Sequence, residues 1–306
     1  MNAATAGKRP KLQRGSRVAV VSPASAAHRD AVLAGCEHLR RQGYEPVLMP
    51  HALDRGPLYY AGTREHRAED FMAAFADASI DGVLCTRGGW GSVELLSLLE
   101  APVLREHPKV FVGYSDHTTL HAWLWNECSL PTFYAPMVAA DWSKDDGVDE
   151  ASWTSAVEAQ GVWQVGTREG MRVLRHGPRV EGRLLGGCLA MLCEALGTPY
   201  ALRLTEPTVL FVEDIHVKPY QWDRMLQHLK FAGWARHVVG VVLGDMSANV
   251  REDEMPLLEG ACLHALAEWQ GPVAIGLGSG HVERHNVSVP LGAWVALEDA
   301  TLKEIR

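Results

Sequence analysis

The sequence lacks several features that would point to whole classes of protein. Its six cysteines are scattered singly along 306 residues, without a C-x-x-C pair, and a chain of this length needs no disulfide staples. We therefore expect reduced, mostly buried thiols. No stretch approaches the roughly 20 apolar residues of a membrane-spanning helix, and Met1 to Gly15 hold no apolar run of signal-peptide length. These absences predict a cytoplasmic protein with no membrane partner.

The sequence also has no excess of positively charged residues. The chain has 29 Lys and Arg against 37 Asp and Glu, a formal net charge of -8. A nucleic-acid partner requires a basic surface, so none is expected. Hydrophobic residues make up 47% and charged residues 22% of the chain, which is typical of a soluble globular protein. The length is sufficient for two domains, each with its own core.

The first half alternates short apolar runs with segments of helical periodicity, which predicts an α/β domain with a parallel sheet and helices on both faces. We assign residues 1–16 to a short disordered leader and residues 17–145 to this N-terminal domain. The predicted strands begin at Arg17, Tyr44, Asp81 and Val110.

Two turns of this domain follow predicted strands. The turn Arg87-Gly88-Gly89-Trp90-Gly91 has neither the G-x-G-x-x-G spacing nor a Walker lysine, but its glycines offer backbone N–H groups to a ligand. Ser115 follows the next strand, directly before a predicted helix. That position exposes a nucleophilic hydroxyl, although Ser115 or Asp116 as a simple helix cap remains an alternative. Both turns lie at carboxyl ends of strands, so they should share one crevice.

The alternation stops between Asp141 and His176, where we place residues 146–180 as a linker before a β-rich domain, residues 181–306. Two features of that domain carry chemistry. A buried strand ends at Glu213-Asp214, and a glycine-rich turn leads to His281. A carboxylate, an imidazole and Ser115 could form a catalytic triad. The residues alone leave Glu213 and Asp214 as alternatives.

Six segments that occur together and in order resemble the LD-carboxypeptidase family. This family of serine peptidases includes muropeptide LD-carboxypeptidases and microcin self-immunity peptidases. The segments are Tyr60–Ala68, Arg87–Gly91, Val112–Asp116, Gly182–Gly187, Phe211–Asp214 and Gly278–His281. The resemblance implies an amidotransferase-like N-terminal α/β domain, a C-terminal β-rich domain, an active-site crevice between them and, commonly, a homodimer.

The resemblance also implies roles for individual residues. Ser115 is expected to be the nucleophile, with Glu213 and His281 as its partners. Backbone N–H groups of the Gly88-Gly89 turn and of Asp116 are expected to form the oxyanion hole.

The expected activity is a serine carboxypeptidase that needs neither metal nor cofactor and releases a terminal D-amino acid from a small muropeptide during peptidoglycan recycling. Arg87 is a candidate for binding the substrate carboxylate. Trp90 and Cys188 stand where the family often has Tyr and Asn, and they bear on substrate choice. Alternatives are a microcin-type peptidase for aminoacyl-nucleotide analogues, which the absence of a long C-terminal insertion disfavours, and a non-catalytic two-domain binding protein.

The remaining histidines compete for functional roles. We interpret four of them as packing or surface residues, and the absence of a His-Glu cluster at metal-ligand spacing argues against a metallopeptidase. These four are His117, His121, His216 and His285.

Overall fold

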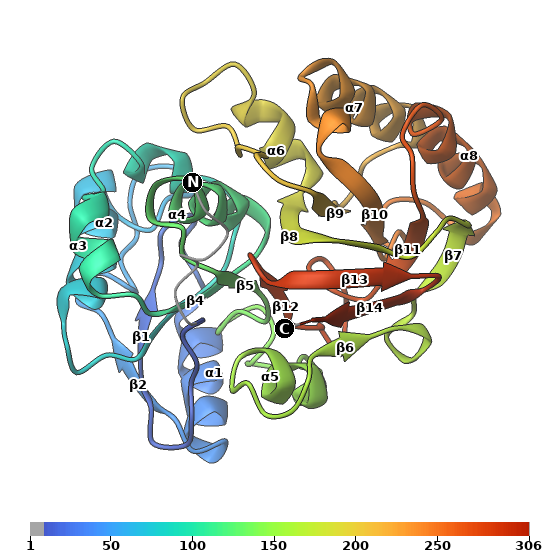
Figure 1. Cartoon of the computed structure of the whole chain (residues 1–306). Coiled ribbons are helices and arrows are strands. Elements are labelled where there is room, and N and C mark those ends of the chain that lie inside the picture. The colour runs from blue at the N-terminus through green and yellow to red at the C-terminus, as the bar shows by residue number, and fades with distance from the viewer. Residues whose placement is uncertain (1–8, 306) are drawn as a thin grey trace.

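The computed structural model describes residues 9–305 and contains two β-sheets joined near the middle of the molecule (Figure 1). The first sheet has the strand order β12-β5-β4-β3-β1-β2. Strands β1 to β5 run parallel, and β12 is antiparallel to β5. The strands are β1 (Arg17–Val21), β2 (Glu45–Leu48), β3 (Gly82–Cys85), β4 (Val110–Gly113), β5 (Thr132–Tyr134) and β12 (Val289–Leu291).

In the first half, helix α1 (Arg29–Arg41) buries one stripe of side chains, whereas the first seven residues of helix α4 (Thr118–Cys128) are all buried. In α1, buried Val32, Cys36 and Leu39 recur at helical spacing. Helix α2 begins after Thr63, whose hydroxyl accepts a hydrogen bond from the His66 N–H and so caps the helix. The helices are α1 (Arg29–Arg41), α2 (Arg64–Ala76), α3 (Ala101–Glu106) and α4 (Thr118–Cys128).

The second sheet has the order β6-β14-β13-β8-β9-β10-β11-β7. Its centre, β8 to β11, is parallel, and its edges are antiparallel. Figure 1 shows α6 (Leu189–Ala195), α7 (Pro219–Phe231) and α8 (Met255–Ala265) along one side of it. The expected two-part α/β architecture is confirmed. The strands are β6 (Gln164–Val165), β7 (Arg172–Arg175), β8 (Val180–Cys188), β9 (Thr208–Glu213), β10 (Val238–Gly244), β11 (Val273–Leu277), β13 (Trp294–Glu298) and β14 (Thr301–Glu304).

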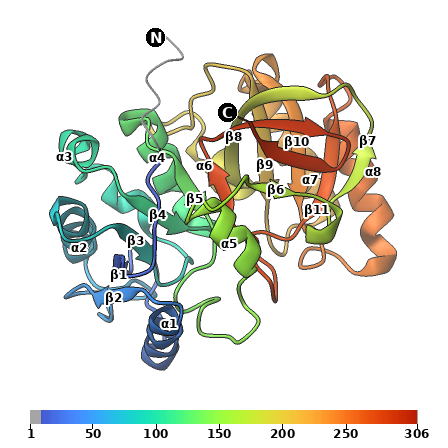
Figure 2. The same cartoon turned by 60° about the horizontal axis from the view of Figure 1, so that its bottom comes forward.

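The segment 146–180, expected to be a linker, is built into the fold. It contains α5 (Glu150–Ala156) and supplies β6 and β7, the two edge strands of the second sheet. Conversely, β12 lies late in the chain but pairs with β5 in the first sheet. Figure 2 shows the two sheets meeting around β5 and α5. The first sheet therefore includes one strand, β12, from the C-terminal part of the chain.

Part of the expected leader is also ordered. Residues 1–8 lie outside the described residues, but Leu12 is fully buried and its N–H donates to the Val157 carbonyl at 2.9 Å. Arg9 forms an ion pair with Glu304 at 2.9 Å. Burial of the apolar Leu12 side chain thus anchors residues 9–16 to the domain. Within residues 9–305, no helix has the length and apolar character that crossing a membrane requires.

Candidate active site

Ser115 occupies a strained turn between β4 and α4. It opens a short 3-10 helix, Ser115–His117, and has φ of +64°, a left-handed conformation that is uncommon for a residue with a side chain. Strain of this kind recurs at functional sites, and a sharp strand-to-helix turn presents a serine hydroxyl for attack. The turn predicted from the sequence is therefore present, with a conformation typical of a nucleophile.

Three residues predicted to act together form one chain of hydrogen bonds. Glu213 ends β9 and is 1% exposed. Its Oε2 lies 2.8 Å from His281 Nδ1, and the His281 backbone N–H also donates to this oxygen at 3.1 Å. His281 Nε2 lies 2.9 Å from the Oγ of Ser115. With Nδ1 donating to the carboxylate, Nε2 is free to accept the serine proton.

Two glycines and an asparagine make room for this carboxylate and hold the turn before His281. A Cβ on Gly244 would lie 2.4 Å from the Cβ of Glu213, and one on Gly280 would lie 2.5 Å from its Cδ. Gly280 also has φ of +91°. The Asn286 side chain accepts from the Gly280 N–H at 3.0 Å and donates to its carbonyl at 3.1 Å. The sequence alone did not identify Gly244 or Asn286.

The electrostatic environment of His281 favours its charged form. Burial by itself would lower the pKa of His281, but the adjacent Glu213 carboxylate outweighs it, with smaller contributions from Asp214 and Asp141, so that the pKa is raised above its usual value. An imidazole next to a carboxylate is a stronger base and is stabilised once protonated. This arrangement suits a general base.

Asp214, the alternative carboxylate, faces elsewhere. Its Oδ2 accepts from the Ala190 N–H and its Oδ1 from the Ile215 N–H, each at 2.8 Å. Ala190 lies in the first turn of α6, where backbone N–H groups lack partners within the helix. Asp214 therefore satisfies a helix start, and Glu213 is the residue that meets His281.

Tyr134 is a member of the site that sequence reasoning missed. It is fully buried in β5. Its hydroxyl accepts from the Ser115 N–H at 3.0 Å and donates to Glu213 Oε1. Burial and the Glu213 charge raise the pKa of Tyr134 well above its usual value, so the hydroxyl keeps its proton. Tyr134 thus connects the nucleophile turn to the triad carboxylate.

The glycine-rich turn lies against the nucleophile. A Cβ on Gly88 would lie 2.9 Å from Ser115 Cβ and 3.1 Å from its Oγ, and Gly89 has φ of +108°. Within residues 9–305, the N–H groups of Gly88 and Gly89 donate to no protein acceptor. Unpaired N–H groups beside a nucleophile can stabilise a developing oxyanion.

Buried side chains tie this turn to the Ser115 turn. His117 Nε2 donates to the Arg87 carbonyl at 3.0 Å, and its Nδ1 accepts from the Ser92 hydroxyl at 3.0 Å. The Asp116 carboxylate accepts from the Ser92 N–H at 2.8 Å. Burial lowers the pKa of His117 to about 4. His117 is therefore a neutral positioning residue.

Comparison with known proteins decides the family. Residues 18–135 match the LD-carboxypeptidase N-terminal domain, and residues 181–297 match the LD-carboxypeptidase C-terminal domain. The chain belongs to the LD-carboxypeptidase family. The Streptomyces coelicolor protein SCO6489, which bears a carboxypeptidase name, is 37% identical over 95% of this chain and 93% of its own.

Two further proteins of known name are similar to this chain. A Bacillus subtilis protein named as a murein peptide carboxypeptidase is 31% identical over 95% of this chain and 92% of its own. The structure of the microcin C7 self-immunity protein MccF matches with a TM-score of 0.85 at 22% identity, over 97% of this chain and 98% of that one. At 22% identity, the match to MccF shows a shared fold.

The residues expected to select the substrate differ in exposure. Arg87 is exposed, and its guanidinium comes within 3.5 Å of the Ala26 carbonyl. Trp90 is half-buried, with its backbone N–H held by the Ser25 hydroxyl at 3.1 Å. Cys188 is buried, and its N–H donates to the Thr118 hydroxyl at 2.9 Å. Arg87 and Trp90 thus flank the glycine-rich turn, while Cys188 is a packed residue.

The other competing histidines lie apart from the triad. His121 is buried and bonds to Thr132 and to the Gly113 carbonyl, at 2.7 and 2.8 Å, and burial lowers its pKa to about 3. His216 and His285 are exposed.

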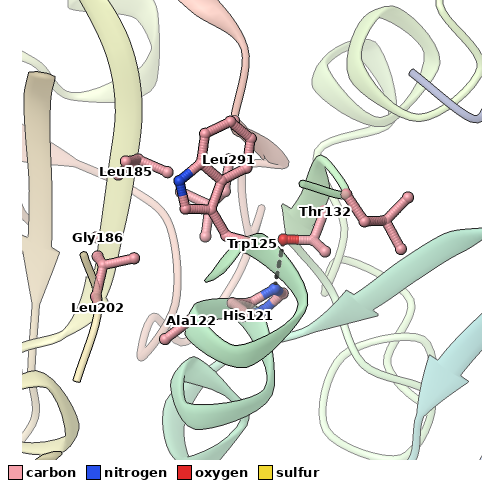
Figure 3. Close-up of a pocket in the computed structure, with 10 residues that line it drawn as sticks. His121, Ala122, Trp125, Thr132, Leu185, Gly186, Leu202 and Leu291 are labelled. Atoms are coloured by element: carbon pink, nitrogen blue, oxygen red, sulfur yellow. Dashed lines mark hydrogen bonds between the residues drawn. The ribbon is translucent and has the colours of Figure 1, made fainter. Parts of the chain in front are cut away.

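His121 lines a small pocket between α4 and β8, next to Trp125 and Leu185 (Figure 3). The interior offers about 10 Å³ to the centre of a water molecule, which is room for one water at most. A peptide substrate cannot enter such a space. The pocket is therefore a gap in packing between the two halves of the LD-carboxypeptidase fold, separate from Ser115.

Proposed function

We propose that this chain is a metal-independent serine carboxypeptidase that hydrolyses the amide between an L-centre and a terminal D-amino acid in a muropeptide. The observation that supports it is the continuous hydrogen-bonded chain from Ser115 through His281 to Glu213. Its position beside the unpaired Gly88 and Gly89 N–H groups adds the second requirement of acyl transfer, a site for the oxyanion.

The reaction follows from this geometry. Ser115 Oγ attacks the scissile carbonyl carbon while His281 Nε2 takes the hydroxyl proton. The Gly88 and Gly89 N–H groups stabilise the oxyanion, and Glu213 stabilises the imidazolium. His281 then donates the proton to the departing amine of the D-amino acid, which leaves an acyl-serine. A water molecule, deprotonated by His281, hydrolyses that ester and regenerates Ser115.

The substrate class rests on two further supports. The Bacillus subtilis relative is named for murein peptides, and Arg87 provides an exposed cation next to Gly88. A fixed guanidinium pairs well with a terminal carboxylate. Pinning that carboxylate and the carbonyl oxygen at two points would leave one face for the side chain, which selects the D-configuration. A role in peptidoglycan recycling, a cytoplasmic location and a homodimeric state belong to this proposal.

The test is a panel of three tetrapeptides that differ only at the end: D-Ala acid, L-Ala acid and D-Ala amide. We expect rapid release of D-Ala from the acid alone. Ser115→Ala should abolish turnover, with a loss of several orders of magnitude, while the folded structure persists. Equal cleavage of the amide would remove the carboxylate site, and equal cleavage of the L-Ala acid would remove the stereochemical claim.

Two additional measurements separate the alternatives. An aminoacyl-adenylate analogue cleaved faster than every tetrapeptide would favour a microcin-type peptidase instead. Labelling with a serine-reactive phosphonate should modify the wild type and not Ser115→Ala. Absence of labelling and of turnover in the wild type would point to a non-catalytic binding protein.

A further inference from the structure

A second cluster of chemically active side chains lies outside the triad. His51 Nδ1 lies 2.8 Å from Asp54 Oδ2, and His66 Nδ1 lies 3.3 Å from the same oxygen. The two imidazole rings stack with centroids 3.9 Å apart and planes inclined by 21°. Two histidines and a carboxylate thus place three possible ligand atoms within 4.8 Å of one another.

The fold holds these side chains in place. His66 lies in the first turn of α2, and one turn later Asp70, which is 2% exposed, accepts from the His51 backbone N–H at 2.9 Å. The Asp54 side chain packs against Gly62, where an added Cβ would lie 3.1 Å from the Asp54 Cβ. Helix α2 therefore positions one ligand directly and another through Asp70.

The two distances to the Asp54 carboxylate are close to those of a metal site. In a tetrahedral zinc site with bonds of about 2.0 Å, neighbouring ligand atoms lie about 3.3 Å apart. The two distances to Asp54 Oδ2 are 3.3 Å and 2.8 Å, so a small opening of the His51–Asp54 contact would admit the ion. We propose that His51, Asp54 and His66 bind one divalent transition-metal ion through the two Nδ1 atoms and the carboxylate, with water in the fourth position.

The chemistry of the ligands selects the ion. Imidazole nitrogens suit Zn²⁺, Ni²⁺, Co²⁺ and Cu²⁺, whereas Mg²⁺ and Ca²⁺ prefer oxygen ligands. The side chains of His51, Asp54 and His66 are 23%, 38% and 46% exposed, so an ion can reach them from solvent. Both imidazoles bind with their proton on Nε2, and binding therefore weakens in acid.

The ion would stabilise the segment between its ligands and would take no part in catalysis. Residues 55–62 lie within this segment, and their backbone pairs with the Ala24–Ala26 turn: the Ala26 N–H donates to Tyr59 O at 2.8 Å and the Ala61 N–H to Ala24 O at 3.0 Å. Ser25, in that turn, holds the Trp90 N–H. Closing the segment with a metal should therefore stabilise the N-terminal half up to the glycine-rich turn.

Zinc binding to the full chain tests the site. Isothermal titration should give one equivalent of Zn²⁺ for the wild type and a rise in Tm, with no response to Mg²⁺. His51→Ala and His66→Ala should each lose the equivalent, and His66→Gln provides a milder variant if an alanine variant folds poorly. His176→Ala is the matched control, because His176 is an exposed histidine that pairs with a single carboxylate, Asp299, and it should retain binding.

Two measurements distinguish this site from the triad and from the thiols. His281→Gln should keep the full equivalent of zinc, and Co²⁺ should give d–d absorption without a thiolate-to-cobalt charge-transfer band. A chelator should remove the rise in Tm while turnover continues. Metal binding at this site and the proposed metal-independent reaction are therefore tested by separate measurements, and either proposal can be wrong without the other. Wild-type protein that binds no zinc, or His51→Ala and His66→Ala variants that bind it unchanged, would overturn the proposal.

Discussion

The two halves of the molecule contribute different kinds of group to the same site. The first half presents Ser115 and the Gly88 and Gly89 N–H groups, whose predicted roles depend on backbone geometry. The second half presents Glu213 and His281, whose role depends on ionisation. The predicted nucleophile and oxyanion donors thus come from one side of the junction, and the predicted proton acceptor comes from the other.

Two histidines illustrate this contrast. His117, in the first half, is fully buried among neutral partners, and burial lowers its pKa to about 4. His281, in the second half, contacts Glu213, and the carboxylate overcomes the effect of burial and raises its pKa. The same side chain is therefore a fixed hydrogen-bonding group in one half and the predicted base in the other. The neighbouring charge decides which role applies.

After Ser115→Ala, the largest effect on kcat is expected from a change in the glycine-rich turn of the first half. In Gly88→Ala the new Cβ would lie 3.1 Å from Ser115 Oγ, which obstructs the oxyanion position. We expect kcat to fall by about 10² to 10³, as on losing one oxyanion donor. Gly260→Ala is the control, because a Cβ there meets nothing within 4 Å. A kcat that stays within about twofold of wild type would exclude this turn from the oxyanion hole.

An intermediate effect is expected at Tyr134, which joins the two halves. Tyr134→Phe removes the hydrogen bond to Glu213 and leaves the Ser115 N–H without its acceptor. Leaving a buried donor without a partner costs about 1–3 kcal/mol of free energy. We expect kcat to fall about tenfold, the equivalent of about 1.4 kcal/mol.

Tyr44→Phe provides a matched control for that variant. Tyr44 is another buried tyrosine, whose hydroxyl bonds to Glu158 and to the Trp153 indole. Its loss should lower Tm without changing kcat. If both variants lower Tm equally and neither changes kcat, Tyr134 has a structural role alone.

The smallest effect is a shift along the pH axis. Only neutral His281 accepts the Ser115 proton, so kcat/KM should be full above the pKa of His281 and fall as pH decreases through it. Since that pKa is raised, the acid limb should lie above the ordinary value of about 6.5. Glu213→Gln should move the limb to lower pH. His117→Gln is the contrast, because the pKa of His117 is lowered to about 4 and this side chain is neutral across the pH range of the acid limb. The limb should not move in this variant.

Local sequence was sufficient for strands β1 to β4 and for the positions of the predicted triad. Apolar runs that end in Ser115 and Glu213, and a glycine-rich turn before His281, are patterns within a few consecutive residues. They locate strand ends, where parallel sheets gather functional groups. The resemblance to a family then gave these residues their expected roles, and the two-part α/β architecture was predicted in outline.

Tertiary structure decided the contacts between residues that are far apart in the chain. Tyr134 meets Glu213 across 79 positions, and Glu213 rather than Asp214 faces His281. Strands β6 and β7, which lie within residues 146–180, form the two edges of the second sheet. Periodicity encodes which face of an element is buried, but the neighbour that covers it depends on strand order, which only the folded chain establishes.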